Sequence, residues 1–144
     1  MTPNEIRLIR ESWTGVEPIA DTAASLFYGQ LFELDPAIQR LFRRTEMAAQ
    51  RKILMQTLTV VVKSLDKLDQ IVPAVQALGR RHAGYGVREA HYATVGEALL
   101  WTLEQGLGDT FTPDVRSAWA TAYGTLAAVM IEAANADAQA EAAA

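Results

Sequence analysis

The sequence predicts an all-α fold with about seven helices of very unequal length. Apolar residues recur at helical spacing along the chain, and no segment alternates apolar with polar residues as a half-buried strand does. Several prolines directly follow a polar residue that can cap a helix, which is typical of helix starts. Helices so unequal do not suit a four-helix bundle, so we expect an irregular arrangement that packs around a central element.

The first half of the chain contains four of the expected helices. Thr2, Pro3 and Glu5 match a capping box with proline in the first turn, so the first helix starts there and ends or bends at Gly15. Residues 43–49 are polar and small and suit a loop. The later helices of this half are expected over residues 17–32, 36–42 and 50–65.

The second half contains the three remaining helices. They are expected over residues 71–82, 89–107 and 115–134, the first of them after a polar connection at 66–69. Gly84 and Gly86 end the first of these helices, and Gly106 and Gly108 end the second. Thr112–Asp114 supplies a cap, a proline and an acidic first turn for the last helix.

Length and composition indicate one globular domain. The chain has 144 residues, half of them hydrophobic, which is enough for a buried core. We assign residues 1–134 to this domain and 135–144 to an Ala-rich tail that either frays the last helix or is disordered. The absence of cysteine excludes disulfides, thiolate catalysis, zinc fingers and iron–sulfur ligation.

Charge and hydropathy exclude further classes. A net charge of −4 argues against a nucleic-acid-binding protein, which needs a clustered positive surface. The N-terminus has neither the basic region nor the apolar core of a signal peptide, and no apolar run approaches the ~20 residues of a membrane span. We therefore expect a soluble cytoplasmic protein.

His82 is the first candidate functional residue. It is one of only two histidines, and it shares one helix face with Val75 and Leu78. An imidazole on an apolar face is either a satisfied core residue or a metal ligand, and the spacing alone leaves both open. The second histidine, His91, is expected to be a surface or helix-start residue.

Besides His82, the chain contains a series of short segments in a definite order. They are Leu26–Tyr28 with Leu31–Phe32, Leu41–Phe42, Gln50 with Leu54, His82 with Gly86–Val87, Ala90–Tyr92 with Val95–Gly96, and Ala118–Trp119 with Ala122–Gly124. With these segments the chain resembles, over roughly residues 5–133, the bacterial single-domain globins, including the Vitreoscilla-type and methanotroph haemoglobins, and the globin domain of flavohaemoglobins. The resemblance implies a globin fold around one haem b, held without thioether bonds because the chain has no cysteine.

The resemblance also implies roles for individual residues. His82 matches the proximal ligand of the haem iron, and Phe42 matches the phenylalanine that stacks on the porphyrin. Val87 follows the ligand's loop. Either Arg80 or Arg81 would pair with a haem propionate, unless they lie on a solvated helix face.

On the opposite side of the haem, Tyr28 and Gln50 match the family's distal pair. A buried phenol needs a hydrogen-bond partner, and a bound O2 that carries partial negative charge would serve. Leu54 would form the apolar wall over the iron.

The proximal side departs from the family pattern. Tyr92 matches the family's proximal tyrosine, but Ala134 occupies the position of the family's glutamate, and Glu132 is two residues away on another helix face. The network that pushes electron density toward iron is therefore incomplete.

Two functions follow as expectations. The first is reversible binding of O2, and of CO and NO, for storage or delivery; the alternative is an enzyme, an NO dioxygenase that depends on a separate flavin reductase. A signalling module that has lost haem is a third, weaker alternative. The basic run from Arg40 to Lys52 is either a solvated face or a docking patch for an acidic electron donor, and the oligomeric state stays open.

Overall fold

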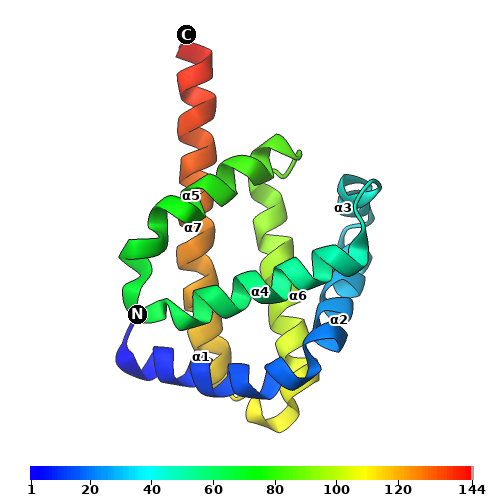
Figure 1. Cartoon of the computed structure of the whole chain (residues 1–144), viewed down its shortest axis with the longest axis vertical. Coiled ribbons are helices and arrows are strands. Elements are labelled where there is room, and N and C mark those ends of the chain that lie inside the picture. The colour runs from blue at the N-terminus through cyan, green and yellow to red at the C-terminus, as the bar shows by residue number, and fades with distance from the viewer. Residues whose placement is uncertain (144) are drawn as a thin grey trace.

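The computed structural model describes residues 1–143, which fold into seven α-helices joined by short connections (Figure 1). The α-helices are α1 (Pro3–Val16), α2 (Ala20–Leu34), α3 (Pro36–Gln39), α4 (Met47–Lys63), α5 (Leu68–Gly84), α6 (Glu89–Leu107) and α7 (Pro113–Ala143). Four single-turn 3₁₀ helices are η1 (Glu17–Ile19), η2 (Arg40–Phe42), η3 (Leu65–Lys67) and η4 (Gly108–Thr110). These residues contain no strand, so the all-α prediction is confirmed.

The capping signals form as expected. The Thr2 hydroxyl accepts a hydrogen bond from the Glu5 N–H at 3.1 Å, and the Glu5 carboxylate accepts one from the Thr2 N–H at 2.9 Å. The Asp35 carboxylate accepts from the N–H of Ala37, and this bond starts α3. Local side-chain chemistry therefore determines these helix starts without help from tertiary packing.

Three expected boundaries are wrong. The loop expected over 43–49 ends early, because the Glu46 carboxylate accepts from the N–H groups of Ala48 and Ala49 and so starts α4 at Met47. Helix α5 begins at Leu68 instead of residue 71, since its exposed first turn carries little apolar signal. Helix α7 continues through residues 135–143 and does not end near 134. The domain boundary at 134 remains a prediction, and Ala144 lies outside the described residues.

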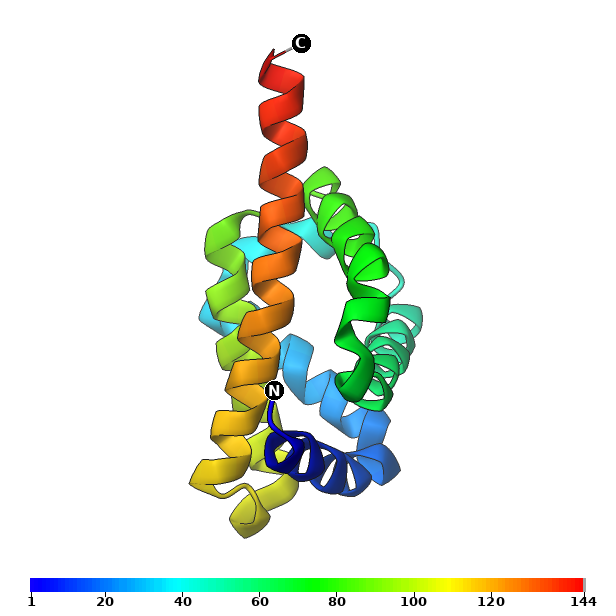
Figure 2. The same ribbon diagram turned by 90° about the vertical axis from the view of Figure 1, so that its left-hand side faces the viewer.

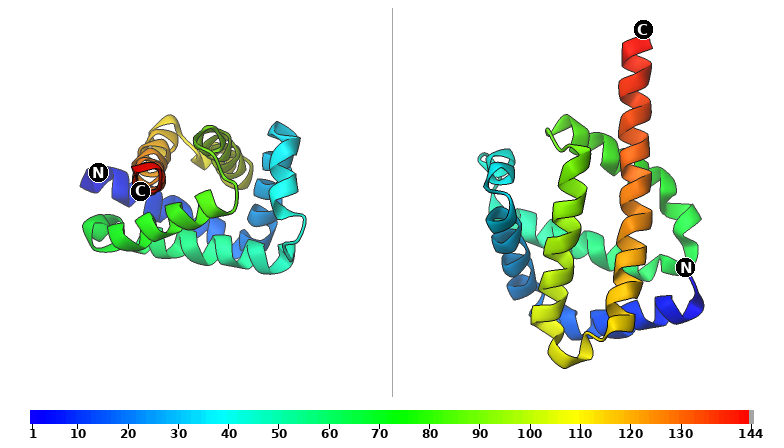
Figure 3. Two further views of the ribbon diagram at one scale, coloured as in Figure 1. Left: turned by 90° about the horizontal axis from the view of Figure 1, so that it is seen from above. Right: turned by 180° about the vertical axis from the view of Figure 1, so that it is seen from behind.

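The helices form two groups. α4 and α5 lie on one side of α6 and α7, with α1 across one end (Figures 2 and 3). The most extensive packing joins α5 to α7 and α2 to α6, and α1 packs against α7. The α5–α7 contact is close because Gly79 has no side chain: a Cβ there would overlap the Met130 carbonyl oxygen and lie 2.6 Å from the Met130 Cα. The far end of α7 extends beyond the other helices (Figure 2).

The hydrophobic core is concentrated in α1, α2, α6 and α7. Its largest buried side chains include Ile9, Trp13, Phe27, Leu103 and Trp119. The Trp13 and Trp119 rings lie 5.8 Å apart, and the Trp119 Nε1–H donates to the Ser12 hydroxyl. Among the described residues, α4 and α5 each contribute a single fully buried apolar side chain, Val62 and Val75.

Several further apolar side chains of α4 and α5 are half-buried, namely Leu54, Leu58, Val61, Ile71 and Leu78. Ile53 and Val60 of α4 are instead more than half exposed. None of the helices within residues 1–143 is both long and apolar enough to cross a membrane.

Candidate functional site

His82 lies in the last turn of α5, half-buried. Its Nδ1–H donates to the Leu78 carbonyl one turn earlier, at 2.8 Å. Burial lowers the pKa of the imidazole, which outweighs the opposing effect of this hydrogen bond, and the neighbouring Arg81 charge lowers the pKa further. The ring is therefore neutral at pH 7, and with Nδ1 protonated its Nε2 lone pair is available to a metal.

The loop after His82 is held by its own backbone. The N–H groups of Tyr85 and Val87 donate to the His82 carbonyl, at 3.1 and 3.0 Å. Gly86 between them has φ +95°, a conformation that side chains disfavour. Leu41 Cδ2 lies 3.3 Å from the position of a Cβ on Gly86, so this loop and η2 are neighbours. Val87 is half-buried, whereas Arg81 is exposed.

Tyr28 and Gln50 meet across two helices. The Gln50 Nε2–H donates to the Tyr28 phenol oxygen at 3.1 Å, although the residues are 22 positions apart. Because Tyr28 accepts this bond, its own O–H proton is free for another acceptor. Tyr28 is only 6% exposed, and burial raises its pKa, so the phenol stays protonated and able to donate at neutral pH.

Aromatic rings fix the orientation of this phenol. The Tyr28 ring lies 5.0 Å from Phe27, 6.0 Å from Phe32 and 5.5 Å from Phe42, measured between centroids. Phe42 ends η2 and is half-buried, as is Leu54 one turn after Gln50 on α4. The structure thus gathers Tyr28, Gln50 and Phe42 into one cluster.

His82 belongs to a separate part of the site. None of the hydrogen bonds or ring contacts of the described residues joins it to Tyr28, Gln50 or Phe42. It lies on α5, whereas the phenol cluster is built from α2, η2 and α4, and α5 packs mainly on α7. The candidate site therefore has an imidazole on one helix and a polar pair on two others.

Tyr92, in the first turns of α6, is half-buried, and burial raises the pKa of its phenol. Its backbone carbonyl accepts a hydrogen bond from the Tyr123 O–H at 2.6 Å. Ala134 is half-buried and Glu132 is exposed, and no carboxylate of the described residues hydrogen-bonds to Tyr92. The hydrogen bond to Tyr92 therefore involves its backbone carbonyl and not its phenol, and the incomplete proximal network stays a prediction.

Two contributors were not singled out from the sequence. The Leu78 carbonyl orients His82, and the four-residue spacing between the two on one helix is the signal that could have predicted this hydrogen bond. Tyr123 holds α6 to α7, where its ring would lie 2.9 Å from a Cβ on Gly96. His91, expected at a helix start, accepts from the Arg88 N–H through Nδ1 at the beginning of α6.

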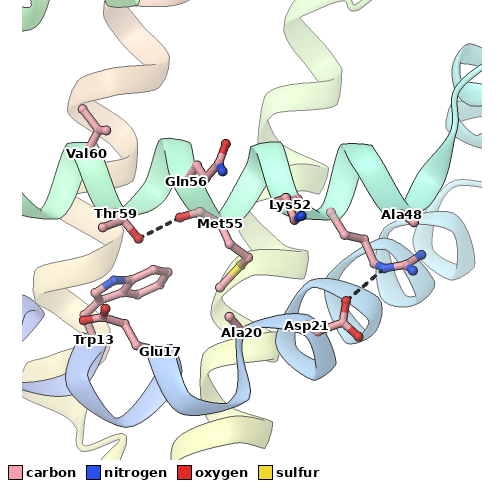
Figure 4. A pocket seen from close by; sticks show the side chains of 11 residues that line it. Trp13, Glu17, Ala20, Asp21, Ala48, Lys52, Met55, Gln56, Thr59 and Val60 are labelled. Carbon is pink, nitrogen blue, oxygen red and sulfur yellow. Dashed lines mark hydrogen bonds and ion pairs between the residues drawn. The ribbon is translucent and has the colours of Figure 1, made fainter.

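A pocket of about 510 Å³ lies away from these residues, between α4 and the junction of α1 with α2 (Figure 4). The Trp13 indole and the Met55 side chain line it, and Arg51 faces Asp21 at one end at 3.6 Å. The residues of α4 that line this pocket lie on a different helix face from Gln50 and Leu54, so none of the predicted site residues contributes to it.

The residues present fit the expected haem. A b-type haem needs one neutral imidazole nitrogen and apolar surfaces on both sides of its ring. His82 supplies a neutral imidazole whose other nitrogen is already hydrogen-bonded, and Phe42, Leu54 and Val87 supply half-buried apolar surface. The donor set and the surrounding side chains agree with that requirement.

The chain is similar to known proteins over most of its length. It is 30% identical to the flavohemoprotein of Bacillus subtilis over 128 residues, which are 88% of this chain and 32% of that protein. It is 29% identical to the flavohemoprotein of Rhodopirellula baltica over 133 residues, which are 91% of this chain and 33% of the relative. The chain therefore spans about a third of the length of these curated relatives.

Solved structures share the fold. A bacterial globin from Campylobacter jejuni superposes with a TM-score of 0.83 at 23% identity, over 96% of this chain and 99% of the other. A hexacoordinated heme protein from an anhydrobiotic tardigrade gives a TM-score of 0.84 at 16% identity, over 94% and 96%. The globin family model matches residues 25–130. The chain belongs to the globin family, and the expected globin fold is confirmed.

Proposed function

We propose that this globin, a haem-binding protein, binds O2 reversibly, for storage or delivery, and takes CO and NO at the same position. The observation that carries the proposal is the hydrogen bond from Gln50 to Tyr28, which leaves a buried, protonated phenol free to donate to a ligand. The fold itself does not require a polar pair inside this aromatic cluster, because an apolar pair would pack there without a desolvation cost.

Haem b, when bound, would supply an iron that binds diatomic ligands reversibly. His82 would hold the iron through Nε2, while the Leu78 carbonyl fixes the ring orientation through Nδ1. Phe42, Leu54 and Val87 would contact the porphyrin and exclude water from it. Arg81, exposed one residue before His82, would pair with a propionate.

Tyr28 and Gln50 act on the ligand side. A ligand that gains negative charge on binding would accept a hydrogen bond from the Tyr28 O–H, and Gln50 keeps the phenol oriented from the other side. The rings of Phe27, Phe32 and Phe42 limit the movement of Tyr28, so the donor is already in place before the ligand arrives. This arrangement slows ligand release more than it speeds ligand entry.

The proximal contacts favour holding a ligand over activating it. The acceptor for His82 is a neutral backbone carbonyl, which increases the basicity of the imidazole less than a carboxylate does. Tyr92 has no carboxylate partner among the described residues, with Ala134 and Glu132 placed as above. We therefore place reversible binding ahead of redox catalysis.

The similarity to flavohemoproteins favours one alternative, conversion of NO to nitrate. That reaction consumes one NO, one O2 and one electron, and the Tyr28–Gln50 pair that retains O2 would serve it as well. A flavohemoprotein carries, by its name, a flavin as well as haem. In this alternative a separate flavin reductase would supply the electron.

A haemin titration tests the proposal. We expect one haem per chain, with a ferrous–CO spectrum typical of histidine ligation, and we expect His82→Ala to lose or alter that spectrum. His91→Ala is the matched control, because His91 is engaged at the start of α6 and should leave the spectrum unchanged. Absence of saturable haem binding, or an effect of His91→Ala equal to that of His82→Ala, would contradict the assignment. Repeated NO consumption with a flavin reductase would favour the alternative.

A further inference from the structure

Basic residues are concentrated in two stretches of the chain, although its net charge is −4. Between Asp35 and Asp66 the only acidic residue is Glu46, and between Asp69 and Glu89 there is none. The same two stretches contain nine of the thirteen lysines and arginines. An acidic protein with two basic stretches has a strongly polarised surface if the fold brings them together.

The fold does bring the two stretches together. Leu41 of η2 lies 3.3 Å from the position of a Cβ on Gly86, so the segment 40–44 borders the loop between α5 and α6. Both segments lie at the same end of the body, near the top of Figure 1. We name the combined area the arginine–tyrosine surface, which consists of Arg40, Arg43, Arg44, Tyr85 and Arg88.

The charges of this surface are not neutralised within the chain. All four arginines are exposed, and none forms an ion pair with another described residue. The neighbouring Arg80 is different, since it pairs with Asp137 at 3.2 Å. The nearby Glu46 carboxylate accepts hydrogen bonds from the first N–H groups of α4. The other acidic residue close to these segments in the sequence is Glu89, which begins α6.

Tyr85 gives the surface an apolar anchor. It is 66% exposed, the largest exposed fraction among the large hydrophobic side chains of the described residues. Tyrosine and arginine are the residue types that carry much of the binding energy at protein interfaces. An exposed aromatic ring on the same surface as unpaired arginines is therefore suited to the acidic face of another protein.

The position next to His82 indicates what kind of protein docks here. The Tyr85 and His82 rings are 6.5 Å apart between centroids. A partner seated on Tyr85 is therefore adjacent to the residue that we assign as the iron ligand. From this geometry we propose that the arginine–tyrosine surface docks the acidic face of a separate flavin-containing electron donor. The proposal rests on the proposed haem function.

The electron transfer needs no bond to form or break. The reduced flavin of the partner would lose one electron, which would reduce the haem iron held by His82 from ferric to ferrous. A brief, salt-sensitive complex suits such a transfer, because charged groups at the edge of an interface accelerate association without slowing release.

The test uses the haem-loaded full chain and an acidic flavodoxin as the probe, with affinity measured calorimetrically at low and at moderate ionic strength. We expect binding at low salt, weakened about tenfold or more at moderate salt. Arg43→Glu/Arg44→Glu/Arg88→Glu should weaken binding at least about tenfold. Lys63→Glu/Lys67→Glu/Arg116→Glu is the matched control, because it lowers the net charge equally at exposed positions elsewhere and should change affinity much less.

Tyr85→Ala separates the anchor from the charges. It should weaken binding by about 5- to 30-fold while leaving the salt dependence unchanged. The ferrous–CO spectrum is recorded for every variant, so that loss of docking with normal spectra overturns only the docking surface. Loss of the haem spectrum in the unmodified chain would instead overturn the proposed function.

Three results would overturn the docking proposal. They are absence of flavodoxin binding at low salt, equal losses in the two triple variants, and binding to phosphatidylglycerol vesicles that depends on the three arginines while flavodoxin binding does not. The last result would assign the surface to an anionic membrane.

Discussion

Tyr28→Phe is the most direct test of how the site holds a ligand. The substitution removes one oxygen atom and keeps the ring, so the contacts with Phe27, Phe32 and Phe42 at 5.0–6.0 Å persist. The phenol is protonated at neutral pH because burial raises its pKa, so the change removes a donor and not a charge. The expected consequence is faster release of O2, with little change in the rate of entry.

The magnitude follows from the hydrogen bond that is lost. A hydrogen bond to a charged group contributes about 1.5–3 kcal/mol, which corresponds to roughly 10- to 100-fold in dissociation rate. Tyr28→Phe also releases Gln50 Nε2 from its 3.1 Å bond, and this amide can then donate to the ligand instead. We therefore expect the single variant near the lower end of the range and Tyr28→Phe/Gln50→Leu near the upper end.

The assay is O2 displacement by CO in a stopped-flow instrument, with the reduced, haem-loaded chain. Tyr123→Phe is the matched control, because it removes the same atom from a half-buried tyrosine whose hydroxyl bonds to the Tyr92 carbonyl. It should cost about 1 kcal/mol of stability and leave the O2 release rate within about twofold. A Tyr28→Phe release rate equal to that of the unmodified chain would refute the role assigned to the phenol.

Two further predictions concern stability and use chemical denaturation. Gly79→Ala should lower the free energy of unfolding by about 3 kcal/mol, because its Cβ would overlap the backbone of Met130; Gly124→Ala, where no atom lies within 4 Å, should raise it by about 0.5–1 kcal/mol. Arg10→Met should cost about 1 kcal/mol by removing hydrogen bonds to the carbonyls of residues 62 and 63 at the end of α4. The hydrogen bond from Arg10 also holds the pKa of Asp66 below its usual value, so the Asp66 contribution is fully present above the usual value and is lost as the pH falls through the lowered value. The stability difference between Arg10→Met and the unmodified chain therefore becomes smaller at low pH but does not vanish, because the carbonyl hydrogen bonds do not titrate.

Helix starts were predictable where one side chain caps them. Thr2 and Asp35 bond to N–H groups two or three residues away, so the signal is contained in a few adjacent letters. Glu46 caps α4 in the same way, but glutamate is a less common capping residue, and the start was placed three residues late. The extension of α7 was missed because its alanine-rich end buries little and gives no apolar pattern.

The individual site residues could be chosen from the sequence, but their contacts could not. The bond between Tyr28 and Gln50 depends on how α2 crosses α4, and helical periodicity contains no information about crossing. The Leu78–His82 bond, by contrast, follows from residues four apart on one helix. The proximity of residues 40–44 to the loop at Gly86 also depends on how the helices pack. The sequence therefore identified the basic run from Arg40 to Lys52, but it did not show that the arginine at the end of the α5–α6 loop belongs to the same surface.

If the proposed function holds, the imidazole side and the ligand side of the site differ in the hydrogen bonds that support them. On the imidazole side, His82 donates to the Leu78 carbonyl, an acceptor that is neutral and part of the same helix, and Tyr92 contacts no carboxylate of the described residues. On the ligand side, Tyr28 is oriented by Gln50 and by surrounding aromatic rings. Strong activation of a ligand requires electron density from the first side, whereas slow release requires a fixed donor on the second. Because the hydrogen bond from Gln50 fixes the Tyr28 donor, the chain is suited to retaining O2. Repeated redox chemistry would depend on which protein docks beside His82.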